Sequence, residues 1–132
     1  MIAMNVITVN QQSNRARVGS DIVLVNGWGI TSGLGPVELE NDRAPLPEGI
    51  ERQTAKILSN LDILLKAAGL GRENVVAVRV YLVDAPRLLE RLNAAYVGFF
   101  PADRLPARTV IGVNHLTRGS QVEMDFVLCA QV

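Results

Sequence analysis

The most constraining feature of this sequence is the stretch from Glu48 to Ala68, in which apolar positions recur at intervals of three and four residues. This spacing places them on one face of an α-helix, and Gly69 is a residue type that commonly ends helices. The positions on this face are Thr54, Ile57, Leu58, Leu61, Leu64, Leu65 and Ala68. An amphipathic helix must bury that face, so the rest of the chain has to provide an apolar layer.

Runs rich in β-branched residues supply this layer. We predict strands over Asn5–Val9, Asp21–Asn26, Val75–Asp84, Arg108–Val113 and Gln121–Ala130. Pro86 followed by an apolar stripe predicts a second helix that ends before Pro101, and the proline-rich residues 31–47 predict a surface loop. The order ββ-α-β-α-ββ predicts an α+β fold, one domain over residues 1–132, with two helices packed on one face of a mixed sheet.

Alternation of residue types within the strands predicts what each face of the sheet packs against. One parity is uniformly apolar and is expected to face the helices: Val76, Val78, Val80, Leu82, Val122, Met124, Phe126 and Leu128. The other parity mixes apolar and charged side chains, including Arg79, Tyr81, Glu123 and Asp125. A face of this composition is typical of burial against another subunit, so we expect a homo-oligomer.

Arg108 stands inside the strand-like run "LPARTVIGV". The same alternation predicts that the core-facing positions are Thr109, Ile111 and Val113. The second face then carries Arg108, Val110 and Gly112. If the last two strands form a hairpin, one register sets Arg108 opposite Glu123, with Cβ atoms about 5 Å apart. From the residues alone, a structural ion pair and a ligand site both stay open.

Composition excludes several classes of partner. Lys+Arg and Asp+Glu both number 13, and this balance argues against a nucleic-acid partner. No apolar run approaches the roughly 18 residues of a membrane span, and the first residues lack a secretory signal. Cys129 is the single cysteine, so we expect a cytoplasmic protein without an internal disulfide. Metal-ligand spacing and a phosphate-binding loop are absent from the sequence, so we expect no metal and no cofactor.

The stretch "PARTVIGV", followed fifteen residues after its arginine by the glutamate of "VEMD", resembles the signature of the reactive-intermediate deaminases, the Rid or YjgF family. The segments "VLVNG", "RQTAKILSNLDILLKAAG", "VVAVRVYLVD" and "LNAAYVGFF" are similar to the family in the same order. The resemblance runs from about Ile22 to Ala130, which is nearly the whole chain.

The resemblance implies a chorismate-mutase-like fold, assembled as a homotrimer with a cleft between each pair of subunits. It implies hydrolysis of 2-imino or enamino acids, such as 2-aminoacrylate, to 2-keto acids and ammonia, as in 2-iminobutanoate/2-iminopropanoate deaminases. Arg108 matches the arginine that binds the substrate carboxylate, and Glu123 matches the acid that orients or activates water. The backbone at Gly27 and Val110 matches groups that line the substrate.

The same fold could also serve two other functions. A non-catalytic protein that binds a small carboxylate in the cleft is the alternative function. RNA cleavage, reported for some family members, is disfavoured because the sequence offers neither a basic excess nor an aromatic platform.

The chain departs from the family pattern in two places. Where the family commonly has a Ser-Gly-Gln step after the second strand, we align Asn26, Gly27 and Trp28, and we expect all three to line the substrate. Trp28 either shapes the site or packs under the loop 31–47. The aromatic residue common near position 15 is missing, and Arg15 or Arg17 either adds positive charge at the cleft or is a solvated surface residue.

Overall fold

The computed structural model describes residues 4–12 and 18–131, so the expectation about Arg15 and Arg17 lies outside the described residues. The elements are β1 (Val6–Val9), β2 (Ile22–Val25), β3 (Trp28–Thr31), α1 (Ile50–Ala67), β4 (Val75–Val83), α2 (Ala85–Tyr96), β5 (Ala107–Val113) and β6 (Val122–Cys129). Two short 3₁₀ helices cover Arg72–Asn74 and Thr117–Gly119. Each predicted strand and helix is found, and β3 is an additional strand that was not predicted.

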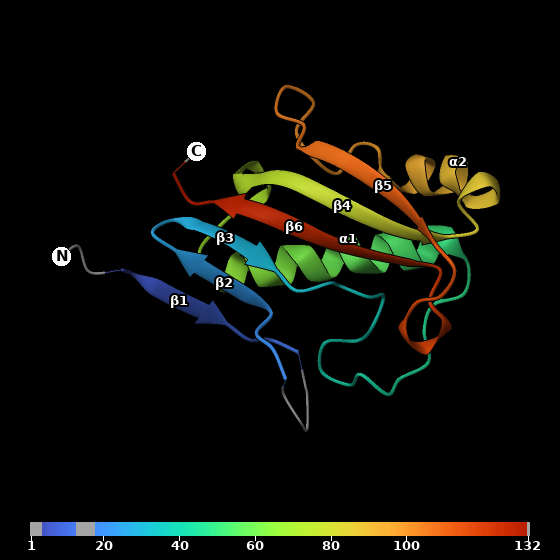
Figure 1. Ribbon diagram of the computed structural model, residues 1–132, viewed down its shortest axis with the longest axis horizontal. Helices are drawn as coiled ribbons and strands as arrows, with labels where there is room; N and C mark the ends of the chain where they lie inside the picture. The colour runs from blue at the N-terminus through green and yellow to red at the C-terminus, as the bar shows by residue number, and fades with distance from the viewer. Residues whose placement is uncertain (1–3, 13–17, 132) are drawn as a thin grey trace.

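The strands form one mixed sheet in the order β1-β2-β3-β6-β4-β5. Only the pair β4–β5 is parallel; the other neighbours are antiparallel. In Figure 1, α1 runs behind the central strands β6 and β4, while α2 packs against α1 and lies beside β4 and β5. The predicted α+β class, with both helices serving one core, is confirmed. No helix in the described part of the chain is long and apolar enough to cross a membrane.

Helix α1 follows the predicted pattern closely and ends in a Schellman motif. Gly69 has a positive φ of 73°, its N–H donates to Lys66 O at 3.0 Å, and the N–H of Leu70 donates to Leu65 O at 2.8 Å. The apolar face of α1, including the fully buried Ile57, Leu61 and Leu64, lies in the core. This helix also holds the loop after β3, because Asn60 Nδ2 donates to Val37 O at 2.7 Å.

The unpredicted strand β3 follows from a tight hairpin. Asn26 and Gly27 have φ angles of 53° and 86°, as a two-residue turn between antiparallel strands requires. Asn-Gly is among the strongest hairpin signals in a sequence. The sequence interpretation took Gly27 and Gly29 as the end of the second strand, so it stopped that strand at Asn26 and placed a loop from residue 31.

Alternation predicted the core face of β6 correctly and that of β4 with one error. Val78, Val80 and Leu82 are buried, as are the four predicted positions of β6. Val76 is only partly buried, because a bulge between Val75 and Ala77 shifts the register against β6 and turns Val75 into the core instead.

The predicted hairpin between β5 and β6 is wrong. Strand β4 lies between them, and β5 runs parallel to β4 with Arg108 beside Val78. A parallel partner is reached through the crossover helix α2, which places β5 on the outer edge of the sheet. Because paired residues share a face, Arg108, Val110 and Gly112 lie on the helix-bearing face, opposite to the prediction.

The residues that the prediction placed under the helices are correspondingly accessible. Thr109 is exposed, and Ile111 is 37% exposed. Val110 instead packs against the core. The error has one physical source, since the faces of a strand were assigned from the wrong pairing partner.

Candidate functional site

Arg108 is held by two side chains of α2. Its Nη2 donates to Asn93 Oδ1 at 2.6 Å, and its guanidinium carbon lies 4.9 Å from the centre of the Tyr96 ring. Asn93 and Tyr96 are three residues apart, so they lie on the same side of the helix. We call this group of three residues the arginine half of the site. It fixes an exposed guanidinium, whose planar fork suits a carboxylate.

The arginine half lies beside a largely apolar cavity of about 310 Å³. Its walls include Tyr96, Val97, Phe100, Leu105 and Pro106. A ligand whose carboxylate contacts Arg108 would therefore place a neighbouring apolar group against these residues.

Glu123 lies on the other face of the sheet, near the start of β6. It is partly buried and lines a small hollow of about 170 Å³ with residues of the loop after β3 and with Arg118. Burial raises the pKa of the Glu123 carboxyl, and the negative charge of Asp125 raises this pKa further. A carboxylate with a raised pKa is a stronger base than a free one when it is ionised.

The carboxylate of Glu123 packs directly on the backbone of Gly33. A Cβ at position 33 would lie 2.8 Å from Glu123 Cδ and still closer to Oε2. Only glycine allows this approach without moving the carboxylate. We call Glu123 and Gly33 the carboxylate half of the site.

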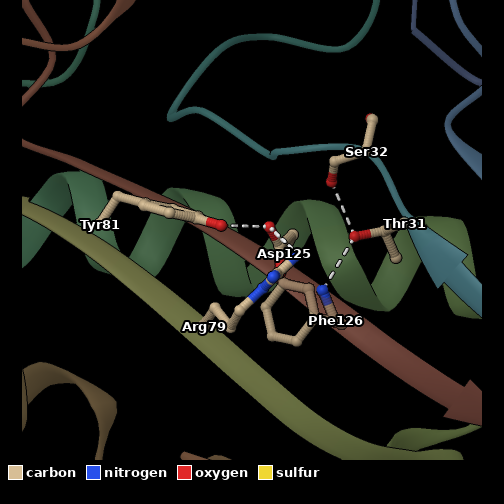
Figure 2. A network of polar contacts seen from close by, with 6 residues as sticks. All are labelled: Thr31, Ser32, Arg79, Tyr81, Asp125 and Phe126. Atoms are coloured by element: carbon tan, nitrogen blue, oxygen red, sulfur yellow. Dashed lines mark hydrogen bonds and ion pairs between the residues drawn. The ribbon is translucent and has the colours of Figure 1, made fainter. Parts of the chain in front are cut away.

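A polar network continues from the carboxylate half along the open face of the sheet. Arg79 Nε and Tyr81 Oη both donate to the Asp125 carboxylate at 2.8 Å, and Figure 2 shows these two side chains converging on it. Tyr81 is the cross-strand neighbour of Glu123. The Asp125 carboxylate thus lies two positions away from Glu123, on the same face, and is paired with Arg79.

Arg118 closes the hollow from the loop between β5 and β6. Its guanidinium donates to the backbone carbonyls of Asp42 and Ala44, the latter at 3.0 Å. This arginine therefore fixes the loop after β3 over the hollow. Its charge is turned towards carbonyl groups of that loop.

The two halves do not meet within one chain. Arg108 is level with Val78 on β4, whereas Glu123 is level with Tyr81 and lies beyond that strand. The separation is about 10 Å along the strands and about 10 Å across them. The two side chains are also on opposite faces, so the predicted contact inside a hairpin is wrong.

The structure places the predicted residues Asn26, Gly27 and Trp28 far from Glu123 in the same chain. Gly27 O accepts a hydrogen bond from Ala130 N at 2.7 Å, so the β2–β3 turn lies at the opposite end of β6, about 23 Å away. Asn26 and Gly27 line a separate hollow beside the end of α1. Trp28 is 54% exposed and lies with Ile30 and Val127 on an apolar part of the open face.

Ser32 and Gly33 are the residues that the sequence interpretation missed. They form a Ser-Gly step at the end of β3, beside Glu123, six residues after the place where such a step was sought. The signal that would have found them is the Asn26-Gly27 turn, because recognising β3 moves the end of the hairpin to Thr31.

Metal ligation is not a feature of the described residues. Within residues 4–12 and 18–131, no group of three or more His, Cys, Asp or Glu side chains is arranged to hold a metal ion. The chemistry that the described site offers is that of a guanidinium, carboxylates and backbone groups.

Known proteins match the chain over most of its length. The family model described as Endoribonuclease L-PSP matches residues 14–130. A RutC family protein of Aquifex aeolicus is 36% identical over 109 residues, which are 82% of this chain and 85% of that protein. The 2-iminobutanoate/2-iminopropanoate deaminase of Mus musculus is 36% identical over 94 residues, which are 70% of this chain and 68% of that protein.

Solved structures have the same fold. RidA from the Antarctic bacterium Psychrobacter sp. matches with a TM-score of 0.81 and 26% identity, over 93% of this chain and 97% of that one. A protein of the conserved Rid family from Yersinia pestis matches with a TM-score of 0.82 and 26% identity, over 96% of this chain and 99% of that one. The region matched by the family model, residues 14–130, includes both halves of the site.

Proposed function

The chain belongs to the family of the Endoribonuclease L-PSP model, which includes the Rid and YjgF proteins, and from this premise we propose that it hydrolyses reactive 2-imino and enamino acids to 2-keto acids and ammonia. The observation that carries the proposal is the pair of half-sites: an exposed, oriented guanidinium at Arg108 and a partly buried carboxylate with a raised pKa at Glu123. The deaminase relatives support this class of reaction.

In the proposed reaction Arg108 binds the substrate carboxylate through charge-assisted hydrogen bonds and thereby fixes the imine carbon. Ionised Glu123 takes a proton from water as the water oxygen bonds to that carbon and the C=N double bond becomes single. Glu123 then returns this proton to nitrogen, which gives a carbinolamine. The proton of the carbinolamine hydroxyl next passes through Glu123 to the same nitrogen as the C=O bond forms and the C–N bond breaks, so that ammonia and the 2-keto acid leave. Water supplies the oxygen, and the reaction needs neither an oxidant nor a reductant.

The proposed active form is a homotrimer in which Arg108 of one subunit and Glu123 of the next face a shared cleft. The opposite placement of the two halves supports this arrangement, because a second copy is needed to bring them together. The open face of the sheet supports it as well, since Ile30 is 59% and Trp28 54% exposed there. Exposed apolar side chains gathered on one face favour burial against another copy.

The remaining residues have proposed roles at the edges of this cleft. Val110 follows Arg108 on the edge strand β5, where its backbone is proposed to line the substrate. The backbone of Gly33, which packs on the Glu123 carboxylate, is proposed to line the cleft on that side. Any part played by Asn26, Gly27 and Trp28 has to be in a cleft completed by a partner, because they lie far from Glu123 of their own chain.

The direct test is imine hydrolysis. An amino-acid oxidase generates imines from several amino acids in the presence of semicarbazide, and the rate of semicarbazone formation reports the imine that escapes hydrolysis. We expect the wild type to lower this rate, Arg108→Ala to lose the effect, and Arg52→Ala, an exposed arginine on α1, to retain it. Equal imine loss with and without Arg108 would contradict the proposal.

The same preparation tests the non-catalytic alternative. Saturable binding of a 2-keto acid, detected as a change in the fluorescence of Trp28, without faster loss of any imine would favour a carboxylate-binding protein.

A further inference from the structure

The strand pairing beside Glu123 contains a bulge. Ile30 pairs with Val127, and the next pairing in this part of the sheet is the bridge between Leu34 and Met124. Between these two pairs, Thr31, Ser32 and Gly33 on one side face only Asp125 and Phe126 on the other. One extra residue on one strand is the defining feature of a β-bulge, and such bulges re-aim the backbone locally.

The side chain of Thr31 takes the place of the backbone partner that the bulge removes. Its Oγ1 accepts a hydrogen bond from the buried Phe126 N–H at 3.1 Å and donates to Ser32 O at 2.7 Å. Figure 2 shows Thr31 between these two groups. Thr31 as a whole is 5% exposed, so water does not readily replace its hydroxyl.

The two ends of the bulge are fixed by backbone hydrogen bonds. Ser32 N donates to Asp21 O at 2.9 Å on the β2 side, and Leu34 N donates to Met124 O at 2.7 Å on the β6 side. Gly33 lies between these anchors, in contact with the Glu123 carboxylate. The conformation of the bulge therefore decides where the Gly33 backbone stands relative to that carboxylate.

We infer that Thr31 is a positioning residue for hydrolysis: its hydroxyl holds the bulge that sets the Gly33 backbone against the Glu123 carboxylate. This inference rests on the proposed function, because the position of Glu123 affects kcat only if Glu123 takes part in hydrolysis. Thr31 acts through the backbone of Ser32 and Gly33 and has no contact of its own with the reacting atoms.

The test compares three substitutions. Thr31→Val keeps the branched shape and removes the hydroxyl, whereas Thr31→Ser keeps the hydroxyl. Thr54→Val on α1 is the matched control, because this buried threonine has a hydroxyl with no hydrogen-bond partner among the described residues. For each variant, kcat and KM for imine hydrolysis, the assembled mass and the melting temperature are measured.

We expect Thr31→Val to lower kcat by about 10-fold or more with KM changed less, because a small displacement of a catalytic group is costly. Thr31→Ser is expected to stay within about 3-fold of the wild type, and Thr54→Val to have the kcat of the wild type. If Thr31→Val does not assemble, Thr31→Cys replaces it, because its thiol is a weaker hydrogen-bonding group. Its kcat is expected to be lower than that of Thr31→Ser.

A double-mutant comparison separates positioning from a general loss of stability. In the Glu123→Gln background, Thr31→Val is expected to cause no further loss of kcat, because the group that it positions is already gone. The inference is overturned if Thr31→Val and Thr54→Val have equal kcat, if Thr31→Ser has as low a kcat as Thr31→Val, or if the loss persists in the Glu123→Gln background. Full activity of Glu123→Gln itself would instead contradict the proposed function.

Discussion

The arginine half and the carboxylate half of the site are built in different ways. Arg108 stands on an edge strand, exposed, and is oriented by the side chains of Asn93 and Tyr96. Glu123 stands on an interior strand, partly buried, and packs on the backbone of Gly33. The first group is suited to capturing an ion from solvent, and the second to proton transfer in a drier place. Under the proposed function, this contrast predicts that substrate binding by Arg108 and proton transfer by Glu123 can be separated by mutation.

The largest expected effects come from removing the two charged groups. Glu123→Gln is expected to lower kcat by about 10²–10⁴-fold, the usual contribution of a general base. Arg108→Ala is expected to act mainly on KM, by about 10²-fold, because charge-assisted hydrogen bonds to the carboxylate are lost in ground state and transition state alike.

Steady-state kinetics over a range of imine concentrations distinguish these outcomes. Glu90→Gln and Arg52→Ala, at exposed helix positions, are the matched controls and should resemble the wild type. If Glu123→Gln changed only KM, the assigned roles of the two halves would have to be exchanged.

A smaller effect is expected from Gly33→Ala. The φ angle of Gly33 is not in the positive region, so alanine introduces no backbone strain, but its methyl group would displace the Glu123 carboxylate. We expect kcat to fall by about 10- to 100-fold with an unchanged melting temperature. Gly35→Ala is the control in the same loop, because a Cβ there meets nothing closer than 3.9 Å. Equal activity of the two alanine variants would show that this contact does not matter.

The smallest expected effect is a shift in the pH profile. The charge of Asp125 raises the pKa of Glu123, so Asp125→Asn should lower this pKa and keep Glu123 ionised to lower pH. The acid limb of kcat/KM, which reports the free enzyme, should therefore move to lower pH. Arg79→Gln removes the cation paired with Asp125 and should move the limb the other way. If the acid limb moved in neither variant, the charge of Asp125 would have no influence on the pKa of Glu123.

The sequence predicted those parts of the fold that depend on local periodicity. The long helix and the apolar parity of β6 were correct because each follows from the spacing of residues within one element. The position of β5 was wrong because hydrophobic parity cannot tell a hairpin partner from a parallel neighbour. The structure therefore places Arg108 on the face opposite to the predicted one. Its identification as a candidate ligand for a carboxylate does not depend on this face.

The site was only partly predictable for a related reason. Glu123 was placed on the open face correctly, since its strand was read correctly. The backbone that contacts it was missed, because Thr31, Ser32 and Gly33 form a bulge whose geometry depends on β6, nearly a hundred residues later in the chain. Long-range pairing of this kind leaves little signal in local sequence.

Complementation between two subunits, each with a lowered kcat/KM, tests the central claim, that each site is completed by two chains. Arg108→Ala and Glu123→Gln subunits carrying different tags are expressed together, and mixed assemblies are isolated through both tags. In a cyclic trimer every mixed assembly has one site with both groups intact, so we expect about one third of the wild-type kcat/KM. Mixed trimers with no more activity than either parent would contradict the shared site.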